Sequence, residues 1–305
     1  MSLLVTGSIG IDTVEAPTGR VEDALGGSSI YFAYAASFFA TAADPIRLVG
    51  VVGEDCPADF LKPLEENAQI DLAGLEVRPG SKTFRWHGRY HDDVNVRDTI
   101  SVDLNVLAER GPTIPEGFRD SEYVFLANTH PGLQLELLAQ CSGAKMVVAD
   151  TMDLWIDAEK GLLLELLGKI DGVVLNDSEA MLLTGKPNAI LAGLEIAGLV
   201  KQFCVVKKGE HGAILFQDGQ SYPLPGYPAA EVVDPTGAGD CFAGGMMGYL
   251  AEQDASDPAA LRRAIAYGTM VASIELEGFS LNRLQEISRA DIDKRLEAFQ
   301  AITGF

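Results

Sequence analysis

Basic residues are scarce in this chain. Its 305 residues include 23 Lys and Arg against 44 Asp and Glu, a formal net charge of −21. Proteins that bind nucleic acid neutralise phosphates with clustered Lys and Arg, and anionic membranes attract the same clusters. We therefore expect no nucleic-acid partner and no membrane partner. An anionic ligand would need a locally positive site, or would have to arrive with Mg²⁺.

Cysteine is equally sparse. The four cysteines are far apart and form no C-x-x-C pair, which excludes a disulfide framework and a cysteine metal cluster and favours a reducing, cytoplasmic setting; they are Cys56, Cys141, Cys204 and Cys241. Cys241 falls at an expected helix start, where a thiol pKa can be lowered. We nevertheless expect it to serve packing.

Long apolar runs are missing too. A membrane-spanning helix needs roughly 18 or more apolar residues. The longest candidate, 30–43, is short and is broken by Ser37 and Thr41. No basic segment precedes the apolar residues at the N-terminus, so we expect no signal peptide.

What is present is the pattern of an α/β protein. Short apolar runs alternate with helix-like segments, which predicts β-α units on a parallel sheet. We expect a Rossmann-like three-layer α/β/α sandwich with a mostly parallel central sheet, in a single domain over residues 1–305. The expected strands are 3–6, 46–52, 123–126, 145–150, 172–176 and 202–207, and the expected helices include 28–42, 131–141 and 289–302.

Two stretches interrupt this rhythm. Residues 12–25 and 82–107 alternate in polarity without a helical period, so they predict strands outside the main sheet. We expect them to form a small β-sheet lid, inserted at about 12–25 and 75–110. On the second stretch, alternation places Arg85, His87 and Arg89 on one face and Trp86, Gly88 and Tyr90 on the other. Such a lid could cover a ligand or pair two subunits into a homodimer.

The most informative segment is 234–240, Asp-Pro-Thr-Gly-Ala-Gly-Asp. It lies between an apolar strand-like stretch and a helix start. Its glycines allow the backbone to approach an anion, and the free N–H groups of a helix start carry positive partial charge. Asp240 adds a proton acceptor beside this anion hole. Together these groups suit phosphoryl transfer.

This segment resembles the second signature motif of the ribokinase-like (PfkB) carbohydrate kinase family. One position differs, because Pro235 stands where the family usually has Thr. The resemblance implies an ATP-dependent kinase in which Asp240 accepts the proton of the attacking hydroxyl. It also implies that the N–H groups of Gly237, Ala238 and Gly239 stabilise the transferred phosphoryl group.

The acceptor side shows the same resemblance. Gly26 and Gly27 precede an apolar helix, as in the first signature motif of the family, and Asp12 follows the first strand where relatives hold substrate hydroxyls. Relatives carry Asn four residues after the second glycine, but here that residue is Tyr31. An amide is thus replaced by a phenol, which could stack on a ring or narrow the pocket.

On the nucleotide side, the chain has an Asn-x-x-Glu element in Asn176 and Glu179, which the resemblance assigns to Mg²⁺. By themselves these residues also predict an ordinary helix cap. A Lys-Gly loop, 207–212, follows the apolar strand at 203–206, and the resemblance assigns Lys208, Gly209 and Gly212 to ATP. Asp234 would be the side-chain ligand of a monovalent cation such as K⁺, if that site exists.

We therefore expect a kinase that phosphorylates a hydroxyl of a small sugar or polyol with ATP and Mg²⁺. The alternative within the family is a nucleoside kinase, towards which Tyr31 and the aromatic lid point. A catalytically inactive nucleotide-sensing protein is disfavoured because Asp240 is intact. A dehydrogenase would need G-x-G-x-x-G after the first strand, and Gly7 to Gly10 do not supply it.

Overall fold

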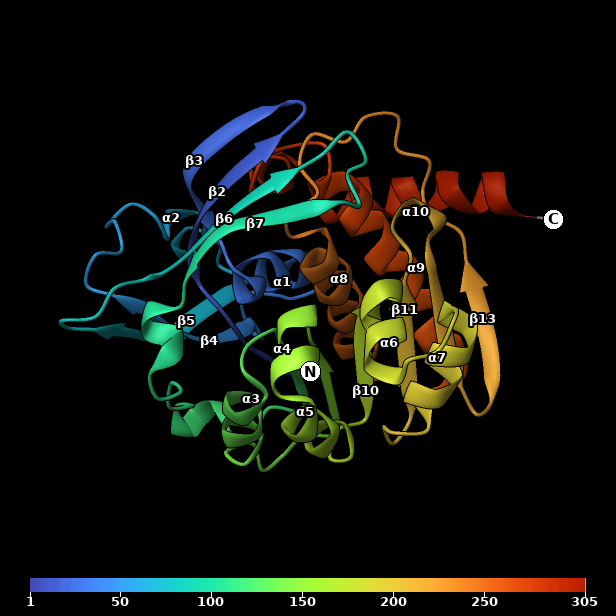
Figure 1. The fold of residues 1–305 in the computed structure, drawn as a ribbon, viewed down its shortest axis with the longest axis horizontal. Coiled ribbons are helices and arrows are strands. Elements are labelled where there is room, and N and C mark those ends of the chain that lie inside the picture. The colour runs from blue at the N-terminus through green and yellow to red at the C-terminus, as the bar shows by residue number, and fades with distance from the viewer. Residues whose placement is uncertain (305) are drawn as a thin grey trace.

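A computed structural model describes residues 1–304 and has two sheets (Figure 1). The larger has nine strands in the order β13-β12-β11-β10-β9-β8-β1-β4-β5, parallel from β11 to β5, with β12 and β13 antiparallel at one edge. Its strands are β1 Leu3–Thr6, β4 Ile46–Gly53, β5 Ile70–Arg78, β8 Tyr123–Leu126, β9 Met146–Asp150, β10 Gly172–Asn176, β11 Phe203–Lys207, β12 Ala213–Gln217 and β13 Gln220–Leu224. The mostly parallel central sheet is confirmed.

Helices cover both faces of this sheet, and each face has its own hydrophobic core. Parallel strands need this double cover because crossover helices fall on both sides. One face carries α1 Ser28–Ser37, α8 Ala238–Gln253, α9 Pro258–Glu275 and α10 Arg289–Thr303; the other carries α3 Pro131–Leu138, α4 Asp153–Ala158, α5 Lys160–Leu167, α6 Asp177–Thr184 and α7 Ala189–Ala197. The short α2 Lys62–Glu65 precedes β5, and 3₁₀ turns lie at Asn105–Ala108, Glu116–Phe118, Gly209–His211 and Leu284–Glu286. The three-layer sandwich is confirmed.

Two expected helices end earlier than the sequence suggested. The helix expected over 28–42 ends at Ser37, and the one expected over 131–141 ends at Leu138. After α1 the chain turns, and Thr41 pairs with Asp44 in an isolated bridge. Pro45 follows, and a proline disfavours helical backbone in the residue before it. Among residues 1–304 no helix has the length and apolarity needed to cross a bilayer.

The second sheet is the expected lid. Its strands are β2 Gly10–Ala16, β3 Gly19–Gly26, β6 Phe84–Tyr90 and β7 Arg97–Asp103, in the order β3-β2-β6-β7. They form a separate blue and teal layer in Figure 1. Residues 75–78 belong to β5 of the large sheet, so the lid hairpin itself begins at Phe84. The β2–β6 pair is parallel, whereas the two outer pairs are antiparallel.

The lid contacts the body of the protein in two regions. Tyr90 and Asn95 bond to the segments around the glycine motif and the Lys-Gly loop, as described below. The β2–β3 hairpin is held separately, because Thr18 donates to the carbonyl of Val233 (2.6 Å) and Ser280 donates to that of Leu25 (2.6 Å). The lid sheet therefore packs over the glycine motif. Its β7 edge leaves Val96, Ile100 and Val102 exposed.

Candidate active site

The glycine motif begins α8, the long helix between α1 and α9. Gly237 is the residue before the helix and adopts a left-handed φ of 88°. A Cβ there would lie 2.4 Å from the ring of Tyr31, so only glycine fits both the turn and the contact. The carbonyl of Gly237 accepts the N–H of Cys241 (2.8 Å) and fixes the first helical turn.

Two of the three expected N–H donors remain available for a ligand. The N–H of Ala238 donates to the carbonyl of Pro235 at 3.3 Å, so it is partly engaged in the turn. Within residues 1–304, the N–H groups of Gly237 and Gly239 have no acceptor. An anion hole at this helix start would therefore rest chiefly on the two glycines.

Asp240 lies in the first turn of α8. Although solvent reaches part of the residue, burial of its carboxyl raises the pKa to about 7. The positive charges of Lys207 and Arg97 counteract this shift, whereas the negative charge of Glu179 adds to it. A carboxyl with a pKa near neutrality is suited to accept a proton at physiological pH.

Lys207 is a residue that the sequence analysis missed. It ends β11, and its Nζ lies 2.6 Å from the position that a Cβ on Gly239 would occupy. Its charge lowers the pKa of Asp240, Glu179 and Asp150. Lys208, which the sequence analysis preferred, follows directly. It lies in the loop closed by its own N–H and the carbonyl of Gly212 (2.7 Å). The cation nearest the glycine motif is thus Lys207.

The Asn-x-x-Glu element forms a helix cap at the start of α6. The Oδ1 of Asn176 accepts the N–H of Glu179 (2.8 Å), and the Oε2 of Glu179 accepts the N–H of Asn176 (2.8 Å). Ser178 also donates to Oδ1 of Asn176 (2.7 Å), so that oxygen is fully engaged. The second carboxylate oxygen of Glu179 has no bond within the described chain. Burial raises the pKa of Glu179, and Lys207 lowers it.

Asp150 ends β9 and is the second carboxylate near this corner. It is buried, and its Oδ1 has no hydrogen-bond partner. Burial raises its pKa well above the usual range, and the charge of Asp240 adds to the effect. Free carboxylate oxygens of Asp150 and Glu179 fit the chemistry of Mg²⁺, which takes one or two carboxylates together with substrate phosphates. No cluster of three or more His, Cys, Asp or Glu side chains suited to a metal occurs in the described residues.

On the acceptor side, Asp12 lies in β2 against Gly26. A Cβ on Gly26 would lie 1.9 Å from Oδ2 of Asp12, so the glycine makes room for this carboxylate. Asp12 is 4% exposed, and its Oδ1 is unpaired. Burial, then the charges of Asp234 and Asp240, raise its pKa to about 8, although the N–H of Gly27 lowers it. An unpaired acid in this position can accept hydrogen bonds from substrate hydroxyls.

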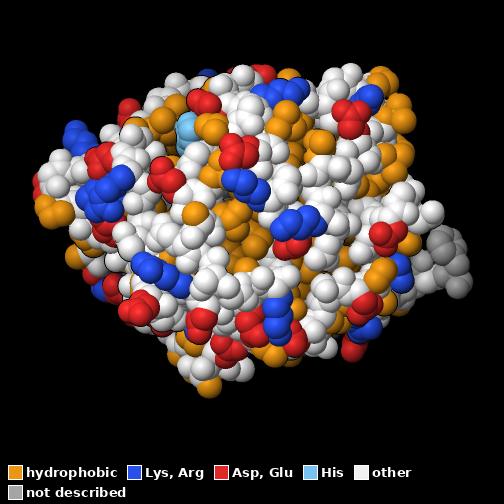
Figure 2. Space-filling view, turned by 90° about the horizontal axis from the view of Figure 1, so that it is seen from below, with side chains coloured by type: hydrophobic (Ala, Val, Ile, Leu, Met, Phe, Trp, Pro, Cys, Tyr) orange, Lys and Arg blue, Asp and Glu red, His pale blue; other side chains and the backbone are white. Residues whose placement is uncertain are grey.

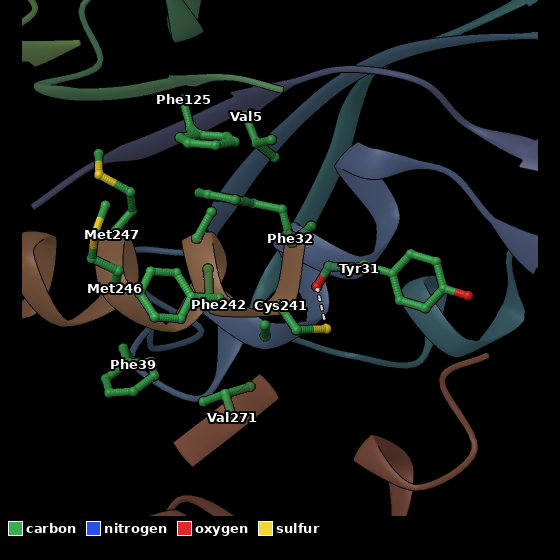
Figure 3. Close-up of a cluster of buried hydrophobic side chains, with 14 of the residues drawn as sticks. Val5, Tyr31, Phe32, Phe39, Phe125, Cys241, Phe242, Met246, Met247 and Val271 are labelled. Carbon is green, nitrogen blue, oxygen red and sulfur yellow. Dashed lines mark hydrogen bonds between the residues drawn. The ribbon is translucent and has the colours of Figure 1, made fainter. Parts of the chain in front are cut away.

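Tyr31 packs beneath the glycine motif. Its residue is 2% exposed, and its carbonyl accepts the thiol of Cys241 (3.7 Å). Figure 3 shows the phenol pointing away from the cluster of apolar side chains around α1 and α8. Burial raises the pKa of Tyr31 well above its usual value, and Asp12 adds to this. The phenol therefore stays neutral and borders the space beside Asp12.

Cys241 serves packing, as expected, but its thiol is not activated. Burial raises the pKa of Cys241 well above its usual value, and the charges of Glu275 and Asp240 add to this. The burial outweighs the helix start, which alone would favour the thiolate. Neither His130 nor His211 is placed as a catalytic base. The Nδ1 of His130 accepts the N–H of Gly132 (3.0 Å) and so caps α3, and His211 is exposed.

Asp234 and Glu275 form a second group of buried acids. Asp234 is fully buried and uses Oδ1 to accept the N–H of Thr236 (2.9 Å), whereas its Oδ2 is unpaired. Glu275 at the end of α9 is also fully buried, with neither oxygen bonded. Burial and the charge of Asp234 raise the pKa of Glu275. Unpaired buried oxygens of this kind need a proton or a cation. No pattern in the sequence pointed to Glu275 as a site residue.

The inner face of the lid carries aromatic side chains. Asp12 and Trp86 are direct partners in the β2–β6 pair, and so are Gly10 and Phe84. Thr236 of the glycine motif donates to the hydroxyl of Tyr90 (3.2 Å). The opposite face carries Arg85 and Arg89, which pair with Asp23 and Glu15 of the lid, and Arg85 also lies 3.8 Å from Asp55 after β4. The predicted division of the two faces is confirmed, and the aromatic face looks into the site.

Fold and site together are those of a kinase: a helix start with free N–H groups, an adjacent acid, a nearby lysine and a small sheet over them. Residues 12–283 match the pfkB family of carbohydrate kinases. The chain belongs to this family.

Two kinases are similar to this chain in sequence. The chain is 32% identical over 256 residues to a cytidine kinase of Thermococcus kodakarensis, covering 82% of this chain and 88% of that protein. It is 26% identical over 231 residues to an ATP-dependent ribose-1-phosphate kinase of Halopiger xanaduensis, covering 75% and 74%.

Solved structures share the fold. A nucleoside kinase of Burkholderia thailandensis in complex with inosine superposes with a TM-score of 0.77 at 21% identity, covering 100% of this chain and 99% of that one. A nucleoside kinase of Methanocaldococcus jannaschii gives 0.76 at 19% identity, covering 98% and 99%. These similarities show the ribokinase fold.

On the face in Figure 2, Lys and Arg side chains are scattered singly among acidic ones. Lys207 and Arg97, whose charges lower the pKa of Asp240 and Glu179, belong to β11 and β7.

Proposed function

We propose that this kinase phosphorylates a ribose hydroxyl of a nucleoside with ATP, the alternative that the sequence left open beside a sugar or polyol. The observation that carries the proposal is the direct pairing of Asp12 with Trp86 on one face of the lid. A carboxylate that can accept the two hydroxyls of a ribose lies beside a flat indole on which a base can stack. The 32% identity to a cytidine kinase supports the same substrate class.

Asp240 takes the proton of the attacking hydroxyl. A pKa of about 7 leaves a useful fraction of this carboxyl ionised at neutral pH. The oxygen then attacks the γ-phosphorus of ATP, and the bond to the leaving ADP breaks. The N–H groups of Gly237 and Gly239 and the ammonium of Lys207 stabilise the charge on the phosphoryl oxygens.

The loop with Lys208, Gly209 and Gly212 would flank the nucleotide, since it directly follows Lys207. Glu179 and Asp150 would hold Mg²⁺ through their free oxygens, and the amide of Asn176 keeps Glu179 in place. The bound metal would supply charge neutralisation for the phosphates. Asp234, with its unpaired Oδ2, would hold a monovalent cation behind the anion hole, where Glu275 can add a second oxygen donor.

A ribose 1-phosphate kinase is the second candidate, given the Halopiger relative. Such a substrate would need a cation beside Asp12. Arg85 and Arg89 lie on the opposite face in ion pairs with Asp23 and Glu15, and Arg97 lies over the Trp86 ring and forms no ion pair with Asp12 in the described residues. This arrangement favours the nucleoside.

The test is the ratio of kcat/KM values with cytidine, inosine, ribose, myo-inositol and ribose 1-phosphate, measured by ADP release with product identification. We expect a nucleoside to exceed every free sugar by at least about 100-fold, since losing a stacked base costs roughly 1–3 kcal/mol and misplacement adds to it. A free sugar or ribose 1-phosphate as the best acceptor would refute the proposed acceptor.

A further inference from the structure

Unpaired polar atoms collect along one stretch of the sheet edge. Strands β1, β8 and β9 are parallel neighbours, so their carboxyl ends lie side by side, on the edge that also carries Lys207 at the end of β11. Buried side-chain oxygens without a hydrogen-bond partner in residues 1–304 end or follow each of these strands; they belong to Thr6, Asn128, Thr129, Asp150 and Thr151. The proposed phosphoryl transfer uses only Asp150 among them. Buried polar groups are costly without a partner, so the others indicate a ligand.

This stretch borders the acceptor side of the site. The hydroxyl of Ser28 donates to the backbone carbonyl of Asn128 (3.3 Å). Ser28 begins α1, directly after the glycine pair that adjoins Asp12. At the other end of the stretch, the charge of Asp240 acts on Asp150 at the end of β9. The unpaired oxygens therefore lie between the carboxylate proposed for the ribose and the proton acceptor at the glycine motif.

The amide of Asn128 is held with its oxygen free. Its Nδ2 donates to Sδ of Met152 at 3.1 Å. A thioether sulfur can accept a hydrogen bond but has no proton to give, so the nitrogen of the amide, and not its oxygen, faces Met152. The unpaired atom of this side chain is Oδ1. Asn128 thus presents a fixed acceptor, which pairs only with a donor of the ligand.

Two threonine hydroxyls beside this acceptor can turn. Thr129 and Thr151 are each 7% exposed, and neither Oγ1 has a partner in the described chain. A hydroxyl can donate or accept, so either one can donate to an acceptor of the ligand. A flat ring with an amino group next to an unprotonated ring nitrogen offers the matching order of donor and acceptor. Cytosine and adenine have such an edge, whereas uracil and hypoxanthine carry a carbonyl and an N–H there.

We propose that Asn128 reads the base of the nucleoside by accepting a hydrogen bond from its exocyclic amino group, while Thr129 or Thr151 donates to the neighbouring ring nitrogen. This inference rests on the proposed nucleoside kinase and names the kind of base that it prefers. Asp12 and Trp86 do not make this choice, because neither contacts the hydrogen-bonding edge of the base. A keto base would bring its carbonyl oxygen against Oδ1 of Asn128 and leave that atom unpaired. Asn128 is thus a specificity-determining residue.

The first test changes the substrate and leaves the protein intact. The values of kcat/KM are measured for cytidine, uridine, adenosine and inosine, and for the cytidine analogue that has hydrogen in place of the 4-amino group. We expect each amino nucleoside to exceed its keto counterpart by about 10- to 100-fold, mainly through KM, and the analogue to fall below cytidine by a similar factor. Equal values within each pair would overturn the inference.

The second test removes the amide with Asn128→Leu, at nearly unchanged volume. We expect kcat/KM for cytidine to fall by about 10- to 100-fold, and the values for uridine and the 4-deamino analogue to change by no more than a few-fold. Such non-additivity would assign the amino group to Asn128. The matched control is Gln217→Met, since Gln217 also has a buried unpaired amide oxygen but pairs with Phe203 at the start of β11, on the opposite edge of the sheet. It should leave the cytidine-to-uridine ratio unchanged.

A further variant separates base reading from a structural role. Met152→Leu conserves volume and keeps the amide, but removes the sulfur that orients it. We expect a cytidine-to-uridine ratio reduced several-fold at an unchanged melting temperature. Asn128→Leu acting equally on every nucleoside would overturn the inference. Failure of the proposed function is distinct, because the wild-type protein would then phosphorylate a free sugar at least as well as any nucleoside.

Discussion

The Nζ of Lys207 lies 2.6 Å from the position that a Cβ on Gly239 would occupy. The end of β11 and the start of α8 therefore meet at one point, with a cation directly over the glycine turn. The long side chain of Lys207 can move aside, so we expect the fold to accommodate a methyl group at position 239. The movement would, however, take the ammonium of Lys207 away from the glycine turn. Gly237 differs, because its φ is positive and its neighbour is the buried ring of Tyr31.

These two glycines should separate function from stability. We expect Gly239→Ala to displace Lys207 and lower kcat by about 10²-fold, with a change in the free energy of unfolding below about 1 kcal/mol. Gly237→Ala should destabilise the protein by about 1–3 kcal/mol or more, through strain and overpacking. Steady-state kinetics and urea unfolding of both variants provide the check. Equal unfolding free energies for the two would show that Tyr31 adapts freely.

The pH dependence of stability follows from the buried acids. Asp12 titrates at about 8 in the folded protein against 3.8 ordinarily, so between these values the folded state holds a proton that the unfolded state lacks. Stability of the apo protein should therefore fall as pH rises from about 4 to about 8, by up to about 1.4 kcal/mol per pH unit for one such group. The shifts of Asp150, Asp234 and Glu275 have the same sign.

Asp12→Asn tests this directly. It should raise the apo melting temperature at pH 8 and flatten its fall with pH, while raising the KM for the acceptor at least about tenfold. Asp157→Asn, at an exposed position in α4, is the matched control and should change neither. A melting temperature that is lower in Asp12→Asn at pH 8 would contradict the assigned protonation.

Magnesium dependence should respond to Glu179. Glu179→Gln keeps an oxygen for the N–H of Asn176, so the cap of α6 survives, but it removes the charge. We expect an unchanged melting temperature and a rise of about tenfold or more in the Mg²⁺ concentration for half-maximal activity. A parallel loss of stability and activity would instead indicate a purely structural cap.

Base stacking has a spectroscopic test, since the chain has two tryptophans, Trp86 and Trp155. In a Trp155→Phe background, cytidine should change the fluorescence of Trp86, whereas ribose should not. Trp86→Leu should raise the nucleoside KM by about 5- to 150-fold, the loss of roughly 1–3 kcal/mol of stacking. Calorimetric binding of cytidine without a fluorescence change would place the base elsewhere.

Much of this architecture was predictable from the sequence. The run of apolar strands alternating with helices predicted the sandwich, and the alternation over 82–107 predicted both the lid and its two faces. The structure of a strongly periodic segment can be predicted from its own residues. The end of α1 at Ser37 depends instead on the isolated bridge between Thr41 and Asp44, which leaves no periodic pattern in the sequence.

The site was predictable where glycines and acids form a local motif, and it was not where tertiary contacts decide. Lys208 was chosen because it adjoins a glycine, but Lys207 is the last residue of β11 and pairs with Asn176 at the end of β10. That register is a signal that strand prediction could have used. No comparable signal existed for Glu275, because an acid at a helix end is ordinarily exposed. The burial of Glu275 depends on the packing of α9 against the glycine motif.

The most direct test concerns Asp240. Wild-type protein and Asp240→Asn are incubated with cytidine, ATP and Mg²⁺, and nucleotide products are separated and identified by mass. We expect the wild type to form cytidine monophosphate in equal amounts with ADP, and Asp240→Asn to lose at least about 10³-fold of this rate with an unchanged fold. Release of ADP without a phosphorylated nucleoside, or an Asp240→Asn variant that keeps most of the rate, would contradict phosphoryl transfer at this corner.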